Sequence, residues 1–234
     1  IIQRYNHALD LIKEVSSTST GELKIGFLGT ASQSFLSDFV MGFTASHPQI
    51  KLSMTSDALD ILVKQLNDGL TDLAFVTHVD KNYLIGLESK TIMKSPLIAV
   101  MHPTHALANR DSLSIKDLSG FPMINFSPQA NPITSDFNKQ IFKKAGAQLN
   151  IVREIPNIET AAFCASINEG VFIMPEYLLS SIGSLRTVPL TDSFAYVTLN
   201  LIWKKKNPNI SIPVFVDSFS TYIQNRNPNL APAD

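Results

Sequence analysis

Along this chain of 234 residues, apolar positions recur in two rhythms that alternate with each other. Short runs of apolar residues, typical of strands, are followed by segments in which apolar residues return every three or four positions, typical of helices. The predicted order is strand "LKIGFLG", helix 34–46, strand "IKLSMTS", helix 58–68 and strand "DLAFVTH". We expect Asp57 to cap the second helix and Gly69 to end it. Strands that alternate with helices of this length indicate parallel βαβ units.

The later part of the chain repeats the pattern after a connecting strand, "PLIAVMHP". The predicted order is strand "PMINF", helix 133–145 ending at Gly146, strand "NIVREI", helix 158–168 and strand "VFIMP". A long strand, "AYVTLNLIWKKK", and a last helix with apolar residues from Phe215 to Ile223 complete the pattern. Two βαβ series joined by two long strands predict an α/β protein of two Rossmann-like lobes.

The first residues, 2–15, have the apolar spacing of a helix and are followed by the polar stop "SSTSTG". This helix begins without a cap, and its apolar stripe has no partner within its own length. We therefore expect either that the chain is a piece of a longer protein or that this helix packs against a partner.

Two polar loops each follow a predicted strand and open a predicted helix. The first, in "GFLGTASQSFLSDF", carries small or hydrogen-bonding residues from Gly29 to Gln33, and the second, in "NFSPQANPITSDF", carries Ser127, Gln129 and Asn131. These residues could serve the fold alone, since a turn from a strand into a helix needs a glycine and a hydroxyl that caps the helix. In open α/β sheets, however, ligands bind beyond the carboxyl ends of the strands. Two such loops, one from each lobe, would line a cleft.

The composition and the apolar helix faces indicate that the chain assembles with another subunit. Charged residues make up 17% of the chain, below the usual figure of roughly 25%, so we expect a surface covered by another subunit. The apolar faces of helices 34–46 and 58–68 also exceed what one sheet face should need; they comprise Phe35, Phe39, Val40 and Phe43, and Ile61, Leu62 and Leu66. The alternative is that the first lobe's own sheet fills them.

The charge balance, 19 basic against 20 acidic residues, indicates that these residues are not themselves a nucleic-acid binder. The single cysteine, Cys164, lies among small apolar residues, so we expect a buried packing thiol in a reducing compartment. No apolar run approaches the roughly 18 residues of a membrane span, and the first residues carry charges where a signal peptide would be apolar. A cytoplasmic protein without a membrane partner is expected.

Catalytic signatures are missing from the sequence. His102 and His105 in "HPTH" look like a ligand pair, but Pro103 breaks the helix that would align them, so a surface turn is the better interpretation. The chain contains no G-x-G-x-x-G after a strand, no G-x-x-x-x-G-K-[ST] and no G-x-S-x-G. We therefore predict a binding module rather than an enzyme, with no metal, no cofactor and no catalytic residue.

Several segments, in this order and spacing, carry a resemblance to a known family. They are "GELKIGF", "FTASHPQIKL", "LNDGLTDLAF", "PLIAVMHPTHAL", "DLSGFPMI" and "INEGVFIMP". From Gly21 to about Ile223 the chain resembles the effector-binding domain of LysR-type transcriptional regulators, preceded by the end of their linker helix. Departures from the family pattern are Asn168 where a glycine is usual, Thr71 where an apolar residue is common, and Lys94 where an acidic residue is frequent. Asn tolerates the left-handed region best among non-glycine residues, so the turn at Asn168 can survive.

The resemblance implies a fold of the type II periplasmic-binding-protein class and a homodimer or homotetramer. Residues 1–20 would be the end of the linker helix, 21–97 with 200–230 lobe I, and 98–199 lobe II. Promoter DNA would be bound only through an N-terminal winged helix-turn-helix domain that this chain lacks. A small-molecule effector would bind between the lobes. The residues expected to contact it are Thr30, Ala31, Ser32, Gln33, Thr77, His78, Phe126, Ser127, Asn131 and Ile158.

Two other functions share this kind of scaffold. A solute-binding protein of a transporter has a similar two-lobed fold, but the amphipathic helix at 2–15 is hard to place in an exported protein. A small-acid dehydratase would need an acid-base constellation that the sequence does not show.

Overall fold

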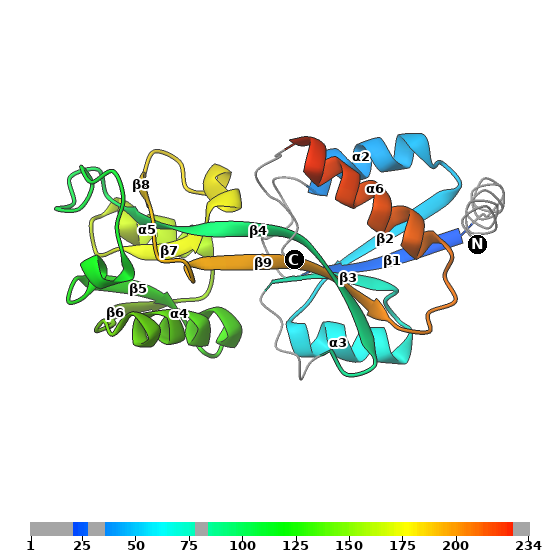
Figure 1. The fold of residues 1–234 in the computed structure, drawn as a ribbon, viewed down its shortest axis with the longest axis horizontal. Helices are drawn as coiled ribbons and strands as arrows, with labels where there is room; N and C mark the ends of the chain where they lie inside the picture. Colours follow the sequence, from blue (N-terminus) through cyan, green and yellow to red (C-terminus); the bar gives the residue numbers. More distant parts are fainter. Residues whose placement is uncertain (1–20, 28–35, 78–83, 227–234) are drawn as a thin grey trace. The chain divides into compact units, whose positions relative to one another are not determined.

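The computed structural model describes residues 21–27, 36–77 and 84–226 (Figure 1). The chain divides into two compact units. Unit 1 comprises the described residues up to Met93 and those from Thr198 onward, and unit 2 runs from Lys94 to Val197. Among the described residues, no helix is long and apolar enough to cross a membrane.

Unit 1 is built on a sheet whose first strands are parallel. Strand β1 (Gly21–Phe27) pairs in parallel with both β2 (Ile50–Ser56) and β3 (Leu73–Thr77), and β9 (Tyr196–Lys204) then pairs antiparallel with β3. The helices between the parallel strands are α2 (Leu36–Ser46) and α3 (Leu59–Asp68). The parallel βαβ units predicted for this part of the chain are confirmed.

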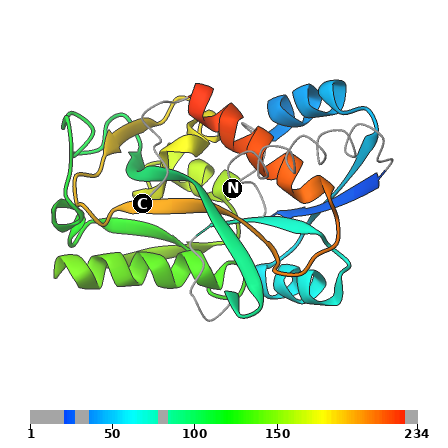
Figure 2. The same ribbon diagram turned by 45° about the vertical axis from the view of Figure 1, so that its right-hand side comes forward.

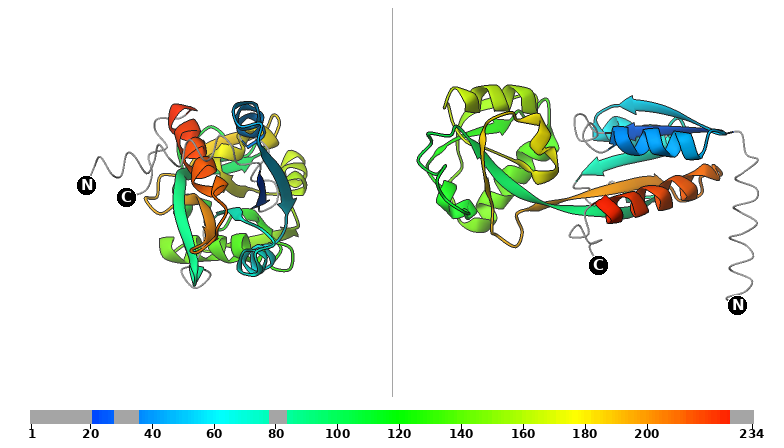
Figure 3. Two further views of the ribbon diagram at one scale, coloured as in Figure 1. Left: turned by 90° about the vertical axis from the view of Figure 1, so that its right-hand side faces the viewer. Right: turned by 90° about the horizontal axis from the view of Figure 1, so that it is seen from above.

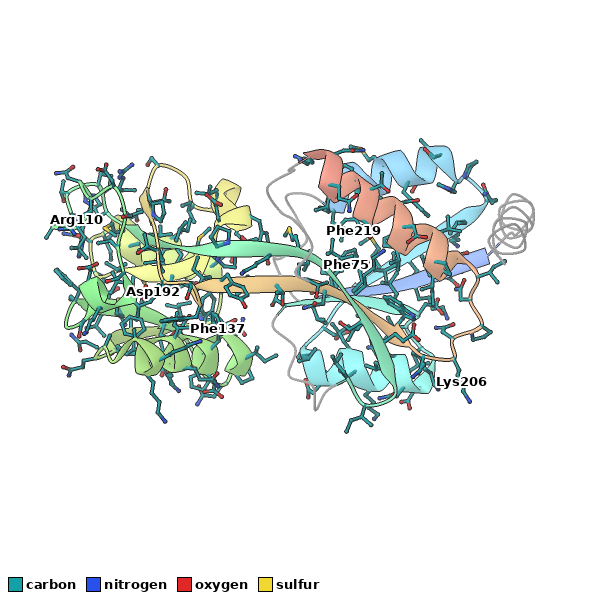
Figure 4. All side chains as sticks on the ribbon, in the orientation of Figure 1. Phe75, Arg110, Phe137, Asp192, Lys206 and Phe219 are labelled. Atoms are coloured by element: carbon teal, nitrogen blue, oxygen red, sulfur yellow. The ribbon has the colours of Figure 1, made fainter. Side chains whose placement is uncertain are left out.

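Helices cover both faces of this sheet. Helix α6 (Ser211–Arg226) lies beside α2 on one face, and α3 lies on the other (Figures 1 and 3). Between α2, α6 and the sheet, Phe219 forms an aromatic cluster with Phe39 and Phe75, with centroid distances of 4.8 Å and 4.9 Å; Phe75 and Phe219 are labelled in Figure 4. These contacts bury Phe39 and also Phe43 within unit 1. The expectation that this face of α2 is left over for another subunit is therefore wrong.

The start of α3 differs from the prediction, whereas its end agrees with it. Ala58, not Asp57, occupies the capping position, and no side chain caps the helix. Asp57 instead accepts a hydrogen bond from Nε2 of Gln65 at 3.0 Å, which takes its carboxylate away from the first-turn N–H groups. Gly69 ends α3 in the left-handed conformation with φ of 73°, as predicted. Leu62 and Leu66 are buried, while Ile61 is 44% exposed.

Unit 2 combines parallel and antiparallel strands. Strand β4 (Leu87–Met101) pairs antiparallel with β7 (Phe172–Pro175) and β8 (Arg186–Pro189). Strand β5 (Pro122–Phe126) pairs in parallel with β6 (Asn150–Ile155). On its other side, the N–H of Ile124 donates at 2.8 Å to the carbonyl of Val171, the residue before β7. Strand β8 was not predicted, because four residues with a single buried position give no periodic signal.

Helices cover unit 2 on two sides. They are α4 (Pro132–Ala145) and α5 (Ile158–Ser166), with short 3-10 helices η3 (Ile115–Leu118) and η4 (Glu176–Ser181) (Figures 1 and 2). One apolar cluster contains Met123 with residues of α4, and the other contains Ile124 with residues of α5. The alternation of neighbouring β5 residues between these clusters is the period-2 pattern of a strand buried on both faces.

The turn before β7 requires two special residues. Asn168 adopts φ of 58°, so the prediction that it takes the left-handed conformation is confirmed. Gly170 is buried against β5, where an added Cβ would lie 2.7 Å from the carbonyl oxygen of Pro122. A side chain at 170 would push β7 away from β5.

Strands β4 and β9 each contain a boundary between the units, at Met93/Lys94 and Val197/Thr198. On the unit 1 side, Thr91 donates a hydrogen bond of 2.8 Å from Oγ1 to Oδ1 of Asn200. On the unit 2 side, Nζ of Lys94 lies 3.7 Å from the ring centroid of Tyr196. The unusual lysine at 94 thus makes a cation-π contact.

Candidate functional site

The carboxyl edge of the parallel pair in unit 2 is the best candidate site. Strands β5 and β6 run in the same direction, so the loop 127–131 and the short connection at 156–157 both leave from this edge. Helix α4 begins after the first connection and α5 after the second. Two helix N-termini are therefore brought to one edge of unit 2. The loop pattern of the sequence singled out only the first of them, at 127–131.

Loop 127–131 is fastened by its own hydrogen bonds. The N–H of Ser127 donates to the carbonyl of Ile155 at 2.8 Å, which ties the loop to β6. The carbonyl of Ser127 accepts from the N–H groups of Ala130 and Asn131 at 3.2 Å and 2.8 Å. The hydroxyl of Ser127 donates to Oε1 of Gln129 at 2.8 Å. The loop thus has a defined shape with its polar groups near the strand ends.

Asparagine caps both helices at this edge. Oδ1 of Asn131 accepts from the N–H of Thr134 at 3.2 Å, and Oδ1 of Asn157 accepts from the N–H of Thr160 at 2.9 Å. Each cap satisfies one first-turn donor, and an α-helix leaves further first-turn N–H groups without a partner inside the helix. At α5 these belong to Ile158 and Glu159. Together with the helix dipole, such groups favour an anionic ligand atom.

Uncharged hydrogen-bonding groups dominate this edge. Ser127, Asn131 and Asn157 offer hydroxyl and amide groups, while the acidic Glu159 is exposed on the first turn of α5. Polar groups of this kind, together with backbone N–H, fix the orientation of small ligands.

Beneath the loop lies a polar cluster that sequence reasoning missed. It consists of Asn125 on β5 with Ser135 and Asn138 on α4, all at most 5% exposed. The available signals were a single asparagine inside the apolar run "PMINF" and two polar residues three positions apart on the predicted helix. Neither signal stands out without knowledge of which faces meet.

Four predicted ligand contacts lie at this edge of unit 2. Ser127 and Asn131 belong to the loop, whereas Phe126 and Ile158 contribute buried side chains to the apolar cluster on the α5 side, at 9% and 3% exposure. Phe126 and Ile158 therefore offer mainly backbone groups at the edge.

The remaining predicted contacts belong to unit 1. Thr77 is the half-buried last residue of β3. Thr30, Ala31, Ser32, Gln33 and His78 lie outside the described residues. The assignment of all ten residues to an effector site stays a prediction.

The ionisable groups of the described residues do not form a reactive constellation. The Nδ1 atoms of His102 and His105 accept hydrogen bonds from the N–H groups of Thr104 and Leu107 at 3.2 Å and 3.3 Å, which confirms a local turn at "HPTH". Burial lowers the pKa of His105 and raises the pKa of Tyr177 far above its usual range. Within the described ranges, no group of three His, Cys, Asp or Glu side chains could hold a metal ion.

Cys164 is buried, as predicted, at 6% exposure. Burial is the main cause that raises the pKa of its thiol, and a hydrogen bond with Glu169 adds to it. Glu169 also forms an ion pair with Arg153. A thiol with a raised pKa is a poor nucleophile at neutral pH.

The family model described as LysR substrate binding domain matches residues 16–222. Among curated proteins, the HTH-type transcriptional regulator AlsR of Bacillus subtilis is 25% identical over 221 residues, which cover 92% of this chain and 71% of AlsR. Among solved structures, the effector binding domain of BenM with its effector benzoate matches with a TM-score of 0.76 and 17% identity, covering 93% of this chain and 100% of that one.

A second solved structure, the effector binding domain of QuiR in complex with shikimate, matches with a TM-score of 0.74 and 22% identity. That match covers 88% of this chain and 99% of the QuiR chain. The fold of the type II periplasmic-binding-protein class, expected from the sequence, is confirmed by these likenesses.

Proposed function

The chain belongs to the LysR substrate-binding domain family, and on that basis we propose that it senses a small-molecule effector for a transcriptional regulator of the cytoplasm. A winged helix-turn-helix domain of the same regulator contacts promoter DNA. The near-neutral charge of this chain, −1, supports this division of labour, because DNA binding depends on a surplus of basic residues.

The observation that carries the proposal is the pair of asparagine-capped helix starts at the carboxyl edge of β5 and β6. Ser127 and Asn131 add neutral hydrogen-bonding groups beside the first of them. First-turn N–H groups and hydroxyls suit a ligand with a carboxylate and further polar atoms. We therefore infer that the effector is a small organic acid, the chemical class to which benzoate and shikimate also belong.

The effector is bound and released without being changed. Its contacts on unit 2 are Ser127, Asn131 and the backbone at Phe126 and Ile158, and on unit 1 they are Thr77, His78 and the residues 30–33. The curated relative AlsR is a transcriptional regulator, which favours this function over solute transport and over catalysis by a dehydratase.

We further propose that the regulator works as a homodimer or homotetramer. Each unit exposes large apolar side chains: Met41 of α2 is 67% exposed, Phe163 of α5 is 63% exposed and Ile167 is 59% exposed. Phe163 and Ile167 are four residues apart, so they share one face of the chain at the end of α5. Exposed apolar residues on neighbouring positions are typical of subunit contacts.

The proposed ligand class is tested with purified protein and a panel of small organic acids that includes benzoate and shikimate. We expect at least one acid to raise the unfolding midpoint, because a ligand that binds only the folded state stabilises it. Calorimetry with that acid should show weaker binding by Ser127→Ala. Ser112→Ala, an exposed serine elsewhere in unit 2, is the matched control and should bind as the wild type does.

Equal affinity of the wild type and Ser127→Ala would remove Ser127 from the site. Failure of every acid in the panel, together with no small molecule found by mass spectrometry of the purified protein, would defeat the proposed ligand class.

A further inference from the structure

A polar network occupies the buried interface between β5 and α4. Oδ1 of Asn125 accepts a hydrogen bond of 2.8 Å from Nδ2 of Asn138, and Nδ2 of Asn125 lies 3.5 Å from Oγ of Ser135, to which it donates. The three residues are 1%, 5% and 0% exposed, respectively. In the described residues, every buried side-chain nitrogen and oxygen has a hydrogen-bond partner, so the network is complete.

Packing alone does not account for these residues. Asn125 is two positions after Met123 on β5, so both face the α4 side of the sheet. Met123 packs there in an apolar cluster with Phe137 and Ile141 of α4. An apolar side chain at 125 would extend that cluster toward the carboxyl end of the strand. Replacing both partners of a buried hydrogen bond by apolar groups of similar shape is often neutral or stabilising, so stability does not require the amide.

The network residues flank loop 127–131 in the sequence, which indicates that they act on that loop. Asn125 precedes Ser127 by two residues, and Ser135 follows the capping residue Asn131 by four. The N–H of Ser135 donates to the carbonyl of Asn131 at 3.1 Å, and the N–H of Asn131 donates to the carbonyl of Ser127 at 2.8 Å. The side-chain bond between Asn125 and Ser135 therefore closes a ring around loop 127–131, and Asn138 holds Asn125 from one turn farther along α4.

We propose that Asn125, Ser135 and Asn138 are positioning residues that fix loop 127–131 and the first turn of α4 in the geometry that receives the effector. The network acts through the loop and not by touching the ligand, since its members are buried. The link to an effector rests on the proposed function, whereas the link to the loop does not.

The test replaces the whole network, so that no polar partner is left buried alone. In the triple variant Asn125→Leu, Ser135→Ala and Asn138→Leu, we expect the unfolding midpoint to stay within a few degrees of the wild type. Amide hydrogen exchange should nevertheless become at least about 10-fold faster at Ser127, Asn131 and Thr134, because this segment opens locally. Amides of β4 and β7 should keep their exchange rates.

The matched control is Asn150→Leu, the same chemical change at the opposite end of β6, where the side chain is exposed and bonds the carbonyl of Gly120 at 3.4 Å. It should leave exchange at Ser127, Asn131 and Thr134 unchanged. If the triple variant does not fold, Asn138→Ala is used, and because it leaves Oδ1 of Asn125 buried without its partner, it is judged only by whether exchange at the loop rises more than exchange in β4 and β7. A purely structural role would instead lower the midpoint and speed exchange throughout unit 2.

Wild-type exchange rates at the loop in a folded network variant would overturn the positioning role. A wild-type protein that binds no organic acid would defeat the proposed function only, because the exchange comparison needs no ligand. For the acid found in the panel above, the folded triple variant should bind at least about 10-fold more weakly; equal affinity would also overturn the positioning role.

Discussion

The ring of Phe39 on α2 meets the ring of Phe219 on α6 edge to face, with centroids 4.8 Å apart and an interplanar angle of 80°. The two helices belong to opposite ends of the chain, so this contact joins the first and last helices that the structure describes. A fully buried aromatic side chain at such a junction contributes by its area and by its ring geometry.

Truncation of the Phe219 side chain should destabilise unit 1. Phe219 is 0% exposed, so Phe219→Ala should lower the free energy of unfolding by about 3–5 kcal/mol. Urea unfolding followed by circular dichroism measures this loss. Ile85→Ala, at a residue 80% exposed, is the control and should change little. A loss below about 1 kcal/mol for Phe219→Ala would show that the cluster does not hold the two helices together.

Assembly should depend on the exposed apolar residues of α5. We expect light scattering of the wild type at micromolar concentration to give at least twice the chain mass of 25.8 kDa. Phe163→Glu should shift the protein toward the monomer, because it places a charge in an apolar contact. Glu159→Gln, one turn earlier on the same helix, removes a charge instead and should leave the mass unchanged. A monomeric wild type would end the dimer proposal.

The ion pair between Arg153 and Glu169 should give a pH-dependent contribution to stability. Its hydrogen bond lowers the pKa of Glu169 from the ordinary value of 4.5. A carboxyl whose pKa is lower in the folded protein stabilises it above the unfolded pKa, and that contribution is lost as pH falls through the folded pKa. The stability difference between the wild type and Glu169→Gln should thus be constant at pH 6–8 and shrink below about pH 4.5. A difference that grows in acid would contradict this assignment.

Cys164 should react slowly with a thiol reagent. Its pKa is raised chiefly by burial, so little thiolate exists at neutral pH, and the side chain is only 6% exposed. We expect modification by a disulfide reagent to be at least about 10-fold faster in urea than in buffer, because it requires opening of α5. Equal rates in the two solutions would mean that the thiol is accessible in the folded protein.

Sequence patterns predicted the βαβ units because the strands of both series are apolar runs and their helices have clear faces. Gly69, Gly146 and Asn168 were also predictable, since each must adopt a left-handed conformation that few residues tolerate. The missing cap at Asp57 was not predictable, because the choice between the helix N-terminus and Gln65 depends on side-chain direction.

Two features of the structure were not predicted because they depend on contacts between segments that lie apart in the sequence. The apolar face of α2 looked unpartnered because α6, which covers it, lies more than 150 residues farther along the chain. The cluster of Asn125, Ser135 and Asn138 was hidden for a related reason, since periodicity shows which residues share a face but not which faces meet.

The boundaries at Met93/Lys94 and Val197/Thr198 have a consequence for synthesis on the ribosome. Unit 2 is one continuous segment, whereas unit 1 is split, and the part of β9 from Thr198 onward and helix α6 are made after unit 2 is complete. Unit 2 can therefore fold during translation, while the early half of unit 1 must wait with Phe39 and Phe75 uncovered. Pairing β3 with β9 then closes a loop of more than 100 residues, the high-contact-order step of folding.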